Sequence, residues 1–71
     1  MIWTPSALSR LERAIDEGTR VQIRRRGGDI VLIPVEIRQV YGGEILVGRH
    51  LGTGDRVQVP MDDVEAFTVI G

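Results

Sequence analysis

The 71-residue sequence contains no cysteine, no lysine and only one histidine, His50. Without cysteine the chain forms no disulfide and no thiolate metal site, and a single histidine does not make a histidine metal cluster. A domain of this length has one small core, which supplies roughly 3–5 kcal/mol of net stability. Because disulfides and these metal sites are excluded, self-association is the stabiliser left, and we expect a homo-oligomer.

Long hydrophobic runs are also absent, although hydrophobic residues make up 42% of the chain, as in a folded globular domain. No apolar run approaches the length of a membrane-spanning helix, so we expect no membrane partner. The first 13 residues lack a cationic stretch followed by an apolar one, which argues against a signal peptide. The expected location is the cytoplasm.

Aromatic residues are scarce, and Trp3, Tyr41 and Phe67 are the only ones. An aromatic cage or a stacking platform for single-stranded nucleic acid would need more of them, suitably clustered. We expect Trp3 instead to fix the start of a helix onto the rest of the fold. No acid/base pair, nucleophile with its base, or metal-ligand set can be assembled, so we predict no enzyme and no cofactor.

Residues 5–17 are predicted to form one helix of about three turns. Thr4 supplies a capping hydroxyl, and Pro5 fits the first helical position, where its missing N–H costs nothing. Gly18 fits the position just after the helix end. The helix has an apolar stripe at helical spacing, formed by Leu8, Leu11 and Ile15.

From Thr19 onward the hydrophobic period changes from 3.6 to 2, which predicts β-strands. The first strand ends before Gly27, and the others are expected at residues 29–41, 44–51, 56–61 and 66–70. Pro34 lies inside the second strand and removes one ladder donor, which predicts a bend or bulge there. Residues 62–65 are predicted to form a 3₁₀-like turn capped by Asp62.

Five short strands, glycine turns and a one-turn spacer before the last strand are typical of a small closed β-barrel. We therefore predict a mainly β fold in a single domain, residues 1–71, with an SH3/Sm-like five-stranded barrel over residues 19–70. The N-terminal helix would cover one open end of the barrel. A flat five-stranded meander covered by the helix is the main alternative.

All nine basic residues are arginine, and they are unevenly distributed. Residues 1–28 carry a net charge of +3 and residues 29–71 carry −4, which gives the overall −1. The strongest local feature is Arg24-Arg25-Arg26, which runs into Gly27-Gly28, and strand alternation places Arg24 and Arg26 on one face. Arginine suits bidentate contacts with phosphate or carboxylate.

Two interpretations of these arginines remain open. They form a patch that binds single-stranded nucleic acid, a nucleotide or an acidic protein surface, or they pair with Asp29, Glu36 or Glu44 at a solvated hairpin end. The isoelectric point of about 5.7 favours the second interpretation, because small nucleic-acid-binding domains are usually basic. The candidate contacts are Arg20, Arg24, Arg25, Arg26, Arg38, Arg49 and Arg56.

A second candidate function is a protein–protein or self-assembly module. Open edge strands of the barrel would then form a dimer or ring.

Two segments in the second half, Glu44–Gly48 and Asp55–Phe67, resemble the C-terminal half of a WYL domain, and Pro34 falls where that family usually has a proline. The likeness covers about residues 19–70. It implies an Sm-like barrel, as in bacterial transcription regulators, which binds nucleotides or single-stranded nucleic acid through basic residues. Glu44 and Ile45 replace the family's Trp and Tyr, Asp63 replaces its last-turn Arg, and no helix-turn-helix domain is present. The resemblance therefore implies the fold more than the ligand.

Overall fold

Helix α1 (Pro5–Glu17) has the bounds predicted from the sequence. In this computed structural model, which describes all 71 residues, the Thr4 hydroxyl accepts a hydrogen bond from the Ala7 N–H at 3.1 Å. Gly18 adopts a left-handed conformation with φ of 66° after the last turn. A residue with a side chain is strained in that conformation, which explains why glycine follows the helix.

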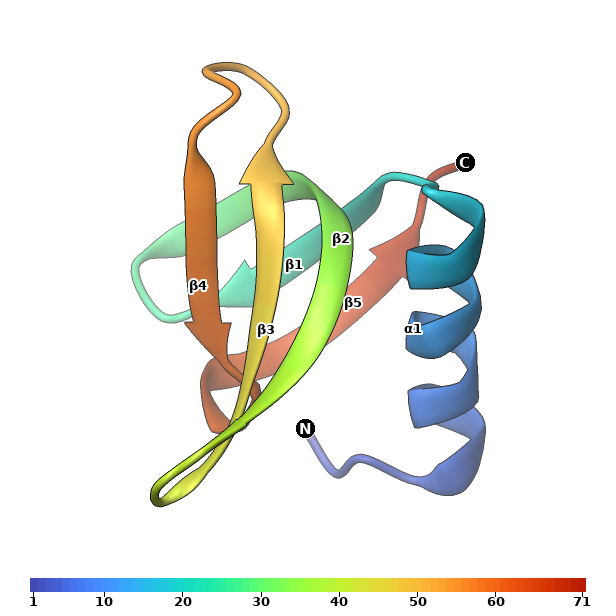
Figure 1. Ribbon diagram of the computed structural model, residues 1–71, viewed down its shortest axis with the longest axis vertical. Helices are drawn as coiled ribbons and strands as arrows, with labels where there is room; N and C mark the ends of the chain where they lie inside the picture. The colour runs from blue at the N-terminus through green and yellow to red at the C-terminus, as the bar shows by residue number, and fades with distance from the viewer.

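Five antiparallel strands form one sheet in the order β4-β3-β2-β1-β5 (Figure 1). The last strand lies beside the first, so the strand order is not that of a simple meander. No pairing joins β4 to β5, and the sheet is therefore not closed by hydrogen bonds. The strands are β1 (Val21–Arg25), β2 (Gly28–Val40), β3 (Gly43–His50), β4 (Arg56–Pro60) and β5 (Val64–Val69), with the 3₁₀ helix η1 (Met61–Asp63) between the last two.

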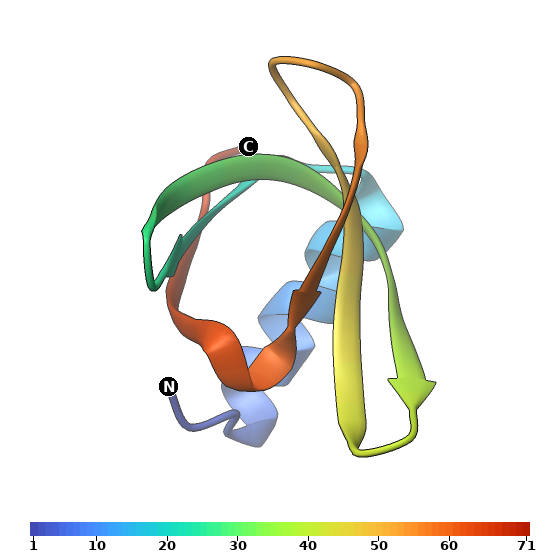
Figure 2. The ribbon, with the colours of Figure 1, turned by 90° about the vertical axis from the view of Figure 1, so that its left-hand side faces the viewer.

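Strand β2 is the long bent strand of the sheet, as Figure 2 shows from the side. Its first part pairs with β1 and its second part pairs with β3. The register with β3 shifts between Pro34 and Glu36, which confirms the predicted bulge. Proline has no N–H to donate to the ladder, so the irregularity falls where a ladder bond is already missing.

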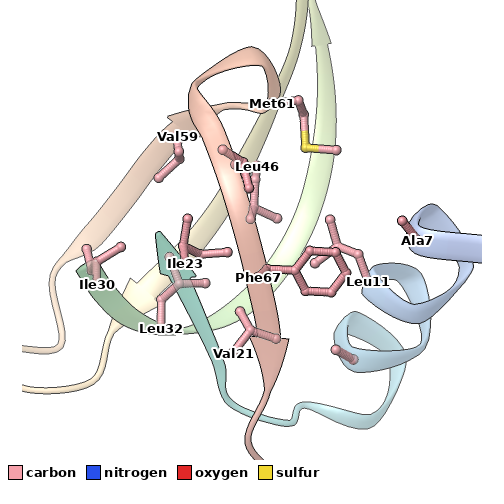
Figure 3. Close-up of a cluster of buried hydrophobic side chains, with 12 residues drawn as sticks. Ala7, Leu11, Val21, Ile23, Ile30, Leu32, Leu46, Val59, Met61 and Phe67 are labelled. Atoms are coloured by element: carbon pink, nitrogen blue, oxygen red, sulfur yellow. The ribbon is translucent and has the colours of Figure 1, made fainter. Parts of the chain in front are cut away.

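A single cluster of buried apolar side chains lies between α1 and the curved sheet (Figure 3). The helix contributes Ala7, Leu11 and Ala14, whereas Leu8 and Ile15 of the predicted stripe are only partly buried beside the cluster. The two alanines are small, so the helix backbone approaches the sheet closely along this line. Leu11 is fully buried and fills the space between the helix and the sheet, whereas Ile15 lies at the edge of the contact between them.

The turn before β5 differs from the prediction. It begins one residue earlier, at Met61, and Asp62 makes no capping hydrogen bond. The predicted capping role of Asp62 is therefore wrong. Met61 and Val64 are both buried, so the turn is positioned by apolar side chains on either side of it, while Asp62 remains exposed.

Trp3 fixes the start of the helix to this turn, as expected. Its indole Nε1–H donates a hydrogen bond to the Met61 carbonyl at 3.0 Å. Its ring stacks on Phe67, with centroids 5.4 Å apart, and the Arg10 guanidinium lies 5.1 Å from the centre of the Phe67 ring. The N-terminal segment therefore contacts both η1 and β5, beside the place where the sheet is open.

Candidate anion-binding site

The seven candidate arginines do not form one continuous patch. Arg20 stands apart, and its Nε–H donates to the Gly71 carbonyl at 3.1 Å. The other six divide into two groups on different elements. The hairpin arginines, at the β1–β2 connection, are Arg24, Arg25 and Arg26; the sheet-face arginines, on β2, β3 and β4, are Arg38, Arg49 and Arg56.

None of the hairpin arginines forms a salt bridge within the chain. The two ion pairs in the structure are Arg13–Glu17 and Arg38–Glu36. The acids that were expected to neutralise the hairpin have other partners. Asp29 accepts from Gln22 at 3.0 Å, Glu44 accepts from Gln39 at 3.0 Å, and Glu36 accepts from Arg38 at 3.1 Å. The hairpin therefore presents three guanidinium groups without a carboxylate partner.

Two of the hairpin arginines line a hollow of about 400 Å³. The hollow lies between the hairpin and the end of β4, and its lining is Arg25, Arg26, Gly27, Val59, Pro60 and Asp63. We call it the hairpin hollow. Both of its arginines belong to the β1–β2 hairpin, and its single carboxylate, Asp63, belongs to η1.

Arg24 lines a different hollow, together with Gln22 and Asp29. Arg24 and Arg26 therefore line different hollows, and their position on one face stays a prediction. Strand β1 ends at Arg25, and Arg26 already belongs to the turn that leads into Gly27, which has φ of 92°. Side-chain alternation applies only within a strand, so it does not extend to Arg26.

The sheet-face arginines lie on three neighbouring strands of the sheet, β2, β3 and β4. Arg49 and Arg56 are directly opposite each other on β3 and β4, and Val47 lies two residues from Arg49 on the same strand. Val47 is only 3% exposed although it lies outside the main core cluster. Opposed like charges on neighbouring strands repel each other, so this pair lowers stability unless an anion lies between them.

Several residues of the hairpin hollow could not be recognised from the sequence. Val59, Pro60 and Asp63 are more than 30 positions from the hairpin, and they meet it only because the strand order returns β5 to the side of β1.

His50 has a structural role: its Nδ1 accepts a hydrogen bond from the Gly52 N–H at 3.0 Å and another from the Thr53 N–H at 3.3 Å.

No cluster of three or more His, Cys, Asp or Glu side chains is placed to hold a metal ion. No helix has the length and apolar character needed to cross a membrane. Comparisons with protein-family models, with curated proteins and with solved structures found no match for the chain.

Proposed function

We propose that this chain is a non-enzymatic binding module that receives an anionic group at the β1–β2 hairpin. The observation that carries the proposal is the absence of any carboxylate partner for Arg24, Arg25 and Arg26. Each guanidinium offers five N–H donors in a planar fork that matches a phosphate or a carboxylate. Charge-assisted hydrogen bonds of this kind are about twice as strong as neutral ones.

The hairpin hollow supports a ligand that is anionic at one end only. Arg25 and Arg26 would contact the anionic group, while Asp63 on the other element would repel a second one. A carboxylate-bearing protein segment with an apolar or donor group beside the acid fits this arrangement better than a uniformly charged polyphosphate. The net charge of −1 also favours an acidic protein surface over nucleic acid, because the whole molecule gives no long-range attraction to a polyanion.

The SH3/Sm-like barrel remains part of this proposal. The position of β5 beside β1 and the single 3₁₀ turn before β5 support it. The membership in WYL domains stays a prediction from the resemblance, since no family model matches the chain.

Fluorescence anisotropy with two labelled probes tests the function: an acidic peptide and a single-stranded oligonucleotide, both at low salt. We expect the acidic peptide to bind, with an affinity that falls as salt is added. Replacing the three hairpin arginines by glutamine should abolish this binding. Replacing Arg38, Arg49 and Arg56 by glutamine is the control with the same charge change, and it should change the affinity by less than about threefold.

Three results decide between the interpretations. Tighter binding of the oligonucleotide, with a slope of about −0.7 in log affinity against log salt for each phosphate contact, would identify nucleic acid as the partner. Binding that survives loss of the hairpin arginines would move the site to the sheet face. Absence of binding by both probes at low salt would remove the proposed function.

A second candidate function, self-assembly through edge strands, is favoured by the open sheet. Strands β4 and β5 each have one side without a partner strand, and exposed Val69 and Ile70 lie at the end of β5. Unpaired strand edges are templates for pairing with another chain. Static light scattering checks this function, because a strict monomer at high concentration would exclude it.

A further inference from the structure

A second feature of the surface is a groove between α1 and β2, with a volume of about 480 Å³. Apolar side chains line part of it: Val35 is 49% exposed, and Ile15 and Ile37 are partly buried. The groove exists because the helix packs on the core through Ala7, Leu11 and Ala14 and leaves β2 uncovered near its bulge. We call it the helix groove.

Three carboxylates also line the helix groove: Glu12 and Asp16 on α1 and Glu36 on β2. Glu12 and Asp16 have no salt bridge, since Arg13, the nearest cation in the sequence, pairs with Glu17. Glu36 uses one carboxylate oxygen for Arg38. The groove is therefore an exposed apolar surface with excess negative charge and only one cation beside it.

The hairpin arginines provide the matching surface within the same molecule. They are cationic and lack a carboxylate partner, while the groove carboxylates lack a matching set of cations. The β1–β2 hairpin and helix α1 lie on opposite sides of the molecule (Figure 1), so the two surfaces do not meet within one copy. They can meet only between two copies.

We propose that the helix groove of one copy receives the β1–β2 hairpin of a second copy. The inference rests on the proposed function, because it names the acidic partner of the hairpin arginines as another molecule of this chain. The methylene stems of the arginines would pack on Val35 and Ile15, while their guanidinium groups reach Glu12 and Asp16.

The geometry makes this contact head-to-tail. Each copy has one hairpin and one groove on opposite sides, so every copy can bind one neighbour through each surface. A contact between two different surfaces gives a closed ring if the rotation between copies closes, and an open chain if it does not. It differs from edge-strand assembly, which would use β4 and β5 and involves neither surface.

Sedimentation velocity of the full chain over a range from micromolar to millimolar tests the proposal. We expect the average mass to rise with concentration and to fall when salt is added. A hairpin variant, R25E/R26E, and a groove variant, E12R/D16R, should each raise the dissociation constant by about tenfold or more, because like charges then face each other. The control E44R/D55R carries the same charge change as the groove variant at residues that line neither surface, and should associate as the wild type does.

Mixing the variants gives the sharpest result. In an equimolar mixture the intact hairpin faces the intact groove, and the glutamate hairpin faces the arginine groove, so opposite charges meet at both contacts and the association that each variant lost alone should return. A wild type that stays monomeric at every concentration would overturn the proposal. Association that survives in both variants, or that is lost equally in the control, would overturn it as well.

The groove variant also separates this proposal from the proposed function, since its hairpin arginines are unchanged. If the wild type is monomeric but the groove variant binds the acidic peptide, self-docking is wrong and the binding function stands. If the groove variant fails to bind the peptide too, both are wrong.

Discussion

Replacement of Gly48 by alanine tests the packing of the bent sheet. Gly48 lies on β3 opposite Pro34, next to the bulge in β2. A Cβ atom placed there would lie 2.7 Å from Leu32 Cδ1 and 2.8 Å from the Ile33 carbonyl oxygen. Favourable contacts between carbon atoms are about 3.5–4.0 Å, and the Ile33 oxygen belongs to the backbone, so β2 itself would have to move.

The magnitude follows from two opposing effects. Overpacking of a core costs about 1–3 kcal/mol. Because the φ of Gly48 lies outside the left-handed region, alanine can adopt its backbone conformation, and the reduced freedom of the unfolded chain returns about 0.4–1 kcal/mol. We expect a net loss of about 1–2 kcal/mol. The loss is large for a domain of this size, whose core supplies roughly 3–5 kcal/mol of net stability.

Urea unfolding followed by circular dichroism measures the change. With an m-value of about 1 kcal/mol/M, the midpoint should fall by about 1–2 M without a change in m. Gly52 is the matched control, because its φ is also outside the left-handed region and its added Cβ would meet only the His50 ring, at 3.1 Å to Cε1. A G48A variant as stable as the wild type, or less affected than G52A, would refute this account of the bend.

Two further predictions concern side chains that hold backbone groups. H50A should lower the free energy of unfolding by about 1 kcal/mol, because two N–H groups of the β3–β4 turn lose their acceptor. H50N should restore most of this free energy, because the asparagine amide oxygen can accept in the same way. Equal urea midpoints for the two variants would contradict this role of His50. W3F should lower the free energy of unfolding by about 1 kcal/mol, because the hydrogen bond to Met61 is lost. W3A should lower it by about 3 kcal/mol, because the stacking on Phe67 is lost as well. Thermal unfolding followed by circular dichroism measures both changes, and equal losses would show that the aromatic ring contributes little.

The elements that the sequence predicts correctly depend on local signals. The helix bounds follow from Thr4, Pro5 and Gly18, which act within one turn of the chain. The bulge in β2 follows from Pro34, whose missing N–H acts wherever the strand pairs. The strands shift by only one or two residues, because the glycine turns between them have positive φ angles that few other residues adopt.

The features that sequence reasoning missed depend on contacts between distant segments. The turn at Met61 is positioned by burial against the core, which a local count of acidic residues does not reveal. The meeting of Arg25 with Asp63 requires the strand order, in which β5 returns to β1. The helix groove depends on which side of α1 packs most closely, and that side is set by Ala7 and Ala14 rather than by the larger Leu8 and Ile15.

The charge asymmetry along the sequence therefore describes the surface poorly. Glu12 and Asp16 belong to the positive half of the chain, yet they join Glu36 of the negative half in the helix groove. The fold thus separates a cationic hairpin from an acidic groove on a molecule with a net charge of only −1. At physiological salt the screening length is about 8 Å, so a partner in contact with one of these surfaces responds mainly to the charge of that surface. Because an outside anion and the groove of a second copy would use the same hairpin arginines, each hairpin can hold only one of them at a time, and the binding function and self-docking would compete.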